Sequence, residues 1–386
     1  MKDRNVKTLK SEEIACSNLP SVAAFPGKYI QGPGSLNQAG EFFGSLGDKF
    51  LILGGMRALA AVETSLTNSL KIAGISWITE VFAGECTQRE IERLVSLGQK
   101  NDVMAVIGIG GGKAIDTAKA VAHYLDKPVG IIPTVASTDA PTSAISVVYT
   151  DDGRFSHYEC YKRNPDIVLV DTEIITKAPI RFLVSGMGGA IGVSYEAEAC
   201  YRSGAKTTSG GRSFLLAVQC ARMARKILLE YGNMAKLSAE NGVWSPAIER
   251  SVEANLLLSG IGFESGGLAL AHSIYHGYRS LGKKNSLHGE VVAFGTLVEI
   301  LLENRPKEEL MQIINFFKDV GLPCTLRQLG IERNNKHEIE KLANIAWEQG
   351  TASNMFFKVD PNQIIASIIL ADRIGSMITS SLGKRF

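Results

Sequence analysis

The first half of the chain alternates short runs of apolar, often β-branched residues with stretches of helix length. Between about residues 25 and 180 there are four such runs, 49–53, 103–107, 129–133 and 167–170, each followed by a glycine or a polar residue. Buried strands separated by helical stretches are typical of a parallel sheet with helical crossovers. Ligands of such sheets bind beyond the carboxyl ends of the strands, so the residues that follow the runs are the first candidates for a site.

The second half of the chain has a helical pattern without a convincing strand. Ser245 followed by Pro246 indicates a helix start, because serine caps free N–H groups and proline suits the first helical position. Gly321, with Pro323 just beyond, indicates a helix end. Helices are expected over 214–231, 246–259, 290–304, 306–320 and 363–380. We therefore predict an α/β domain with a Rossmann-like parallel sheet, residues 1–178, followed by an all-helical domain, residues 179–386.

Composition narrows the class of protein. The chain has 386 residues, more than one core usually serves, and its 45% hydrophobic and 21% charged residues are ordinary for a globular protein. A net charge of +2 without a basic block argues against a nucleic-acid partner, and no apolar run is long enough to span a membrane. The polar segment Met1–Asn18 does not resemble a secretory signal. We expect a cytoplasmic protein with reduced thiols, because no CxxC pair occurs among Cys16, Cys86, Cys160, Cys200, Cys220 and Cys324.

A glycine-rich turn follows the apolar run 103–107. It comprises Gly108, Ile109, Gly110, Gly111, Gly112 and Lys113 and precedes a helical stretch. Consecutive glycines permit a tight turn and a close approach to a pyrophosphate, whose charge the N–H groups of the next helix can accept. The spacing matches neither standard nucleotide fingerprint, so a simple tight turn is the alternative. Asp116 and Lys119 follow on the helix, where a pair on a solvated face is the simplest interpretation.

Three of the six histidines, His272, His276 and His288, lie within 17 residues of one another. His272 and His276 are four residues apart and would share one face of a helix. Imidazole is the commonest zinc ligand, and a catalytic zinc needs three protein ligands with one position open. Two histidines are candidate ligands and a third ligand is not evident. Hydrogen-bonded structural histidines are the alternative.

Taken together, these segments resemble the glycerol dehydrogenases within the iron-type (group III) alcohol dehydrogenases. The resemblance starts at Phe25 and covers nearly the whole chain. It rests on PGKYIQG at 26–32, GIGGGKAIDTAK at 108–119, PTVASTDAP at 133–141, EAEAC at 196–200, GIGFESGG at 260–267 and the histidine segment. The resemblance implies the dehydroquinate synthase-like fold of that family and NAD bound between two domains. It also implies zinc, a small polyol or ketone substrate, and a cytoplasmic homo-oligomer, often an octamer.

The resemblance also implies roles for individual residues. Asp139 corresponds to the family's glycerol-contacting aspartate, His272 and His288 to its zinc-binding histidines, and His276 to a histidine near the substrate. The cofactor positions would be Gly110, Gly111, Gly112, Lys113 and Ala114 at the pyrophosphate, Thr134 and Ser137 at the adenosine and phosphates, and Ser143, Ile145 and Tyr149 beside the nicotinamide. In that chemistry zinc lowers the pKa of the substrate hydroxyl, and hydride leaves the same carbon for the nicotinamide.

Two positions depart from the family pattern. The family's third zinc ligand is an aspartate, and this chain has Gly189 in its place, so we predict weak or absent zinc binding. Glu196 or His276 in a shifted geometry is the alternative ligand, and Val193, one helical turn on, offers none. The second departure follows the run 49–53, where the family often has an acidic residue for the ribose hydroxyls. Because Gly55 stands there, with Arg57 close by, we expect relaxed discrimination between NAD and NADP unless Arg57 is merely an exposed residue.

Three functions are consistent with these residues. The first is a polyol or hydroxy-carbonyl oxidoreductase, with glycerol and dihydroxyacetone as the default pair. The second is a cofactor-binding homologue without redox activity. The third is a metal-independent ketone or keto-acid reductase in which His276 or His272 donates the proton. A sugar-phosphate cyclase of the dehydroquinate-synthase type shares the fold, but Asp139 and the segment 263–267 fit the glycerol enzymes better.

Overall fold

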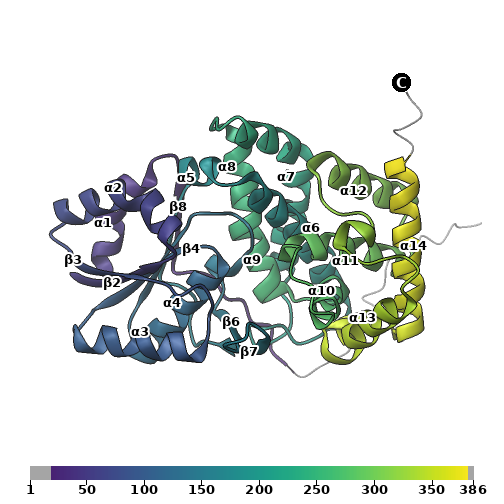
Figure 1. The fold of residues 1–386 in the computed structure, drawn as a ribbon, viewed down its shortest axis with the longest axis horizontal. Coiled ribbons are helices and arrows are strands. Elements are labelled where there is room, and N and C mark those ends of the chain that lie inside the picture. The colour runs from purple at the N-terminus through teal and green to yellow at the C-terminus, as the bar shows by residue number, and fades with distance from the viewer. Residues whose placement is uncertain (1–18, 381–386) are drawn as a thin grey trace, which may run out of the picture.

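The computed structural model describes residues 19–380 and shows a sheet domain at one side and helices at the other (Figure 1). The expected α/β sheet followed by a helical region is confirmed. The segment Met1–Asn18, where no secretory signal is expected, and Cys16, for which a reduced thiol is expected, lie outside the described residues. Within 19–380, no helix combines the length and the apolar character that crossing a membrane requires. The division into domains after residue 178 stays a prediction.

The six-stranded sheet is parallel throughout and has the strand order β1-β8-β5-β4-β2-β3. Its strands are β1 (Lys28–Gly32), β2 (Lys49–Gly54), β3 (Ser76–Val81), β4 (Ala105–Gly110), β5 (Val129–Pro133) and β8 (Ile167–Asp171). The four predicted strands are the buried β2, β4, β5 and β8. One of them was misplaced, because β4 starts two residues later and continues through the glycines to Gly110, which pairs with Pro133 of β5.

Four strands lacked a clear signal in the sequence. The edge strands β1 and β3 are only partly buried, so they mix polar and apolar residues instead of forming an apolar run. The antiparallel hairpin of β6 (Ile145–Tyr149) and β7 (Phe155–Cys160) forms a separate two-stranded sheet.

Helices cover the large sheet in the first half of the chain and pack on one another in the second half (Figure 1). The first group is α1 (Ala39–Phe43), α2 (Met56–Ile72), α3 (Gln88–Lys100), α4 (Gly112–Leu125) and α5 (Thr172–Lys177). The second group is α6 (Ile180–Ser203), α7 (Leu215–Glu240), α8 (Pro246–Glu253), α9 (Ser259–Ile261), α10 (Leu270–Ser280), α11 (His288–Leu302), α12 (Lys307–Val320), α13 (Lys336–Gln349) and α14 (Pro361–Ser380).

The predicted helix boundaries follow from capping chemistry. Ser245 caps α8 through its side chain, which accepts a hydrogen bond from the backbone N–H of Ile248. Gly321 ends α12 in the left-handed region, with φ of 91°. The helix predicted over 246–259 is interrupted, because α8 passes into a π-helical turn at Ala254–Leu258, and a second π turn at Gly262–Gly266 follows α9. Such turns often occur at functional sites.

Candidate active site

The glycine-rich turn lies between the carboxyl end of β4 and the start of α4. Gly110 has φ of 139°, which side-chain-bearing residues rarely adopt, and Gly111 is the N-cap of α4 without a side-chain cap. A Cβ on Gly111 would come within 3.3 Å of Val135 Cγ2, so the glycine keeps space open above the helix start. The first-turn N–H groups of α4 are thus presented at the edge of the sheet where ligands of this fold bind. This arrangement suits an anionic group such as a pyrophosphate.

The other predicted cofactor residues surround this turn. Lys113 is exposed, and its Nζ lies 2.6 Å from Glu85 Oε2 and over the ring of Tyr149, so its charge is already paired. Ala114 is buried in the first turn of α4. Thr134 directly follows β5, and its backbone N–H donates to the Gly110 carbonyl at 3.1 Å. Ser137 lies half-buried in the next loop, Ser143 is buried, and Ile145 and Tyr149 are the first and last residues of β6.

Lys119 is buried, so the expectation of a solvated face on α4 was wrong. Its ammonium lies 2.9 Å from Asp116 Oδ1, and both residues are less than a tenth exposed. Lys119 also donates to the backbone carbonyls of Ala140 at 3.0 Å, Ser143 at 3.3 Å and Ile145. Burial raises the pKa of Asp116, and the charge of Lys119 opposes that shift. The buried pair therefore ties the loop 140–145 to the helix that follows the glycine-rich turn.

The helical region holds the same loop from its other side. Asn255, in the first π turn, donates to the carbonyl of Ala136 at 3.0 Å, and Glu264, in the second, accepts from the N–H of Ala144 at 2.9 Å. Between them, the hydroxyl of Ser259 in α9 donates to Asp139 Oδ2 at 3.0 Å. The two π turns thus set the position of the loop that carries Asp139.

Asp139 and His272 influence each other electrostatically. Burial raises the pKa of the Asp139 carboxyl, while the charge of His272 and the hydrogen bond from Ser259 lower it. Burial alone would lower the pKa of His272, but Glu196, by its charge and hydrogen bond, and Asp139 raise it above its ordinary value. Loop 134–143 and the start of α10 therefore border the same part of the molecule.

Two of the three predicted histidines meet at the ends of α10 and α11. The Nε2 atoms of His272 and His288 are 3.1 Å apart, and Tyr275 packs edge-on against the His288 ring. Burial, followed by the charge of His272, lowers the pKa of His288. His276 lies one turn along α10 from His272 and has another partner, since its Nε2 is 3.1 Å from the Tyr158 hydroxyl of β7. Burial lowers the pKa of His276 to about 4, which makes it a poor proton donor near neutral pH.

Within the described residues 19–380, no third zinc ligand accompanies this pair. Two imidazoles on one tetrahedral zinc would place their nitrogens about 3.3 Å apart, close to the observed separation. At Gly189, however, a Cβ would find only Gly289 Cα, at 3.9 Å, so the space for a side chain exists and is not used. Glu196 binds the opposite edge of the His272 ring, and Val193 is buried among apolar residues. Within residues 19–380 no three His, Cys, Asp or Glu residues are grouped to hold a metal. The residues present do not fit a three-ligand catalytic zinc.

Comparison with known proteins identifies the family. The model of the iron-containing alcohol dehydrogenases matches residues 26–172. The chain is 44% identical to glycerol dehydrogenase from Citrobacter freundii over 91% of its own length and 96% of that enzyme, and 42% identical to the one from Thermotoga maritima over 92% and 97%. It belongs to the glycerol dehydrogenase family. Glycerol dehydrogenase from Schizosaccharomyces pombe has the same fold, with a TM-score of 0.90, 34% identity and coverage of 95% of this chain and 94% of that one. This member of the glycerol dehydrogenase family is an NAD-dependent oxidoreductase of the alcohol and polyol class.

Sequence reasoning missed the residues that position the site. Asn255, Ser259 and Glu264 act on the loop 134–145 from more than a hundred residues away, so no local pattern connects them. One feature of the sequence indicated a close contact with another segment: Gly260 lies in a helical stretch, where glycine is unfavourable. A Cβ there would come within 1.9 Å of Thr142 Oγ1, which explains why this position is a glycine.

Proposed function

We propose that this protein transfers hydride between NAD and a small polyol or hydroxyketone, with glycerol and dihydroxyacetone as the first pair to test. The observation that carries the proposal is the identity of 42–44% to several glycerol dehydrogenases over about nine-tenths of the chain. The glycine-rich turn, Asp139 and the His272–His288 pair border a common region, which supports the same function.

Each part of the site has a distinct task in this proposal. The turn Gly110–Gly112 and the first turn of α4 bind the cofactor pyrophosphate, and Thr134 and Ser137 lie toward its adenosine side. Ser143, Ile145 and Tyr149 line the nicotinamide, which supplies the hydride acceptor when NAD is bound. Asp139 accepts hydrogen bonds from the substrate hydroxyls, and Ser259 orients Asp139.

We do not assign a zinc-dependent step to this chain. The substrate oxygen must exchange a proton when hydride is transferred, and His272 presents its Nε2 on the side of the ring that faces His288. Of the two histidines considered for this proton transfer, His272 fits better, because the pKa of His276 is lowered to about 4 by burial. Reduction of a ketone by this route is the second candidate function, and the absence of a side chain at Gly189 favours it.

Three finer points belong to the proposal. Gly55 is the N-cap residue of α2 and faces open space, and Arg57 is exposed close by, so NADP is the second cofactor to test. We also propose that the protein forms a homo-oligomer, with the octamer of the family as the model. The third point is a cytoplasmic location.

A substrate panel tests the proposal. The purified full-length chain is assayed for NAD and NADP reduction with glycerol and other small diols, and for NADH oxidation with dihydroxyacetone and simple keto acids, each with and without added zinc. Polyol-dependent NAD reduction supports the first function, and activity confined to ketones in a zinc-independent manner supports the second. Cofactor binding without turnover on any substrate contradicts both.

A further inference from the structure

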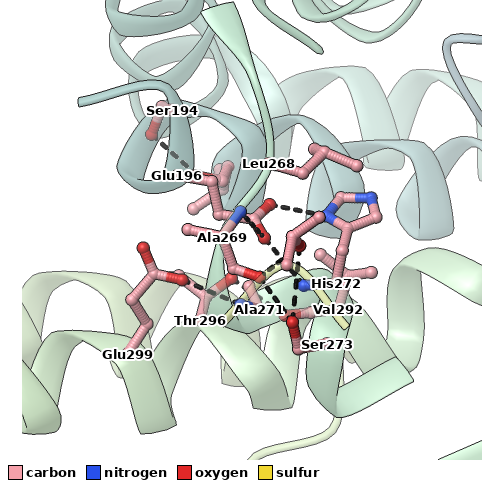
Figure 2. Close-up of polar contacts among 12 residues, drawn as sticks. Ser194, Glu196, Leu268, Ala269, Ala271, His272, Ser273, Val292, Thr296 and Glu299 are labelled. Carbon is pink, nitrogen blue, oxygen red and sulfur yellow. Dashed lines mark hydrogen bonds and ion pairs between the residues drawn. The ribbon is translucent and has the colours of Figure 1, made fainter. Parts of the chain in front are cut away.

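The first turn of α10, which carries His272, is buried and has no capping side chain of its own. Its N-cap is Ala269, and the N–H groups of Ala269, Ala271 and His272 would be unpaired inside the protein without an outside acceptor. Two buried carboxyl groups from neighbouring helices serve this purpose, Glu196 of α6 and Glu299 of α11 (Figure 2). Both are fully buried, with 0% of their surface exposed.

Glu196 accepts three hydrogen bonds with its two oxygens. Oε1 accepts from the N–H groups of Ala269 at 2.9 Å and His272 at 2.8 Å, and Oε2 lies 2.5 Å from His272 Nδ1. Only a group with two acceptor oxygens can satisfy donors on both sides in this way. A glutamine has one acceptor oxygen, so its amide N–H₂ would have to face either the two backbone N–H groups or the imidazole.

We propose that Glu196 is a positioning residue that fixes the hydrogen of His272 on Nδ1 and thereby presents Nε2 to the site. This inference rests on the proposed function of His272. When the His272 ring is neutral with its hydrogen on Nδ1, its Nε2 is an acceptor, 3.1 Å from Nε2 of His288. Carboxylates that orient metal-ligating histidines act in this manner, and their loss lowers activity about 10- to 100-fold, which we take as the scale expected here.

Glu299 provides a matched comparison, because it lies beside the same helix start without touching the imidazole. Its Oε2 accepts from the N–H of Ala271 at 2.8 Å, and its Oε1 has no hydrogen-bond partner within residues 19–380. A glutamine at this position keeps the one acceptor that is used. The substitution Glu299→Gln should therefore preserve what Glu196→Gln removes.

The experiment measures the tautomer of His272 directly. Full-length protein with ¹⁵N-labelled histidine is examined by NMR, and the His272 signals are assigned by their loss in His272→Ala. We expect hydrogen on Nδ1 in the wild type and in Glu299→Gln. In Glu196→Gln the amide N–H₂ that replaces Oε2 forces Nδ1 to accept, so the hydrogen moves to Nε2. The kcat for the best substrate should fall about 10- to 100-fold in Glu196→Gln, with KM for NAD unchanged, and stay within about twofold in Glu299→Gln.

Two results would overturn the inference. One is a neutral His272 with its hydrogen on Nε2 in the wild type, a measurement that does not depend on whether any variant folds. The other is Glu196→Gln with an unchanged tautomer and an unchanged kcat. If the wild type turns over no substrate, the proposed function fails, while the tautomer measurement still decides the role of Glu196.

Discussion

An aspartate in place of Gly189 should complete a three-ligand zinc site with His272 and His288. The Cβ of an aspartate there would meet nothing nearer than Gly289 Cα, at 3.9 Å, and glycine inside α6 is itself unfavourable. The backbone therefore accepts Gly189→Asp without strain. The new carboxylate would start from a helix that packs against α11 beside His288.

The gain in zinc affinity can be estimated from the number of ligands. Structural zinc sites with four ligands bind with about 10–16 kcal/mol, so one further ligand contributes roughly 3 kcal/mol, or a hundredfold in affinity. Free zinc at a hundred times the new Kd would stabilise the variant by about 2.7 kcal/mol against unfolding. The wild type should show little change in its melting temperature at the same zinc concentration.

The assay is metal content by atomic emission after loading with zinc and dialysis, together with thermal unfolding with and without zinc. Gly189→Ala is the matched control, because it adds the Cβ without the carboxylate. We expect stoichiometric zinc in Gly189→Asp only. Stoichiometric zinc in the dialysed wild type, or equal zinc affinity in all three proteins, would refute the reasoning.

Three further predictions concern the cofactor side. Lys119→Met leaves the Asp116 carboxylate and three carbonyls without their buried partner, so the free energy of unfolding should fall by about 3–5 kcal/mol. Removing both charges in the double variant Asp116→Asn/Lys119→Met should recover part of this loss. Equal stability of the wild type and Lys119→Met would contradict the buried pair. Gly110→Ala places a side chain at a φ of 139°, so it should cost about 1–3 kcal/mol of stability and raise the KM for NAD. Thermal unfolding and steady-state kinetics measure the two effects. Unchanged values would argue against the turn as the phosphate site. Gly55→Asp places a carboxylate in open space after β2 and should raise the preference for NAD over NADP about tenfold or more. The preference is measured as the ratio of kcat/KM with NAD to kcat/KM with NADP. An unchanged ratio would place the ribose elsewhere.

The central strands were predictable because their burial on both faces requires unbroken apolar runs. Val129–Pro133 was placed at its observed bounds for this reason. β4 was misplaced because two of its last three residues are glycines, Gly108 and Gly110, which carry no apolar signal although they pair in the sheet. The edge strand β3 is only partly buried and mixes polar with apolar residues, so it forms neither an apolar run nor a regular alternation.

The candidate site was predictable only as far as its residues are neighbours in sequence. The spacing of His272 and His276 placed both on one helix, as observed, but it did not separate their partners, Glu196 and Tyr158. Lys119 was misjudged because its partner carbonyls lie 21–26 residues further along the chain. Burial of a charge depends on such long-range partners, and hydrophobic periodicity does not record them.

The central claim is that hydride passes from a polyol carbon to the cofactor. Glycerol carrying deuterium on its middle carbon, incubated with NAD and the wild-type enzyme without added zinc, tests this claim most directly. The reduced cofactor should carry one deuterium at C4 of the nicotinamide, detected by mass spectrometry or NMR, and dihydroxyacetone should form with it. Unlabelled reduced cofactor, or no reduction of NAD by glycerol under any condition with or without zinc, would contradict it.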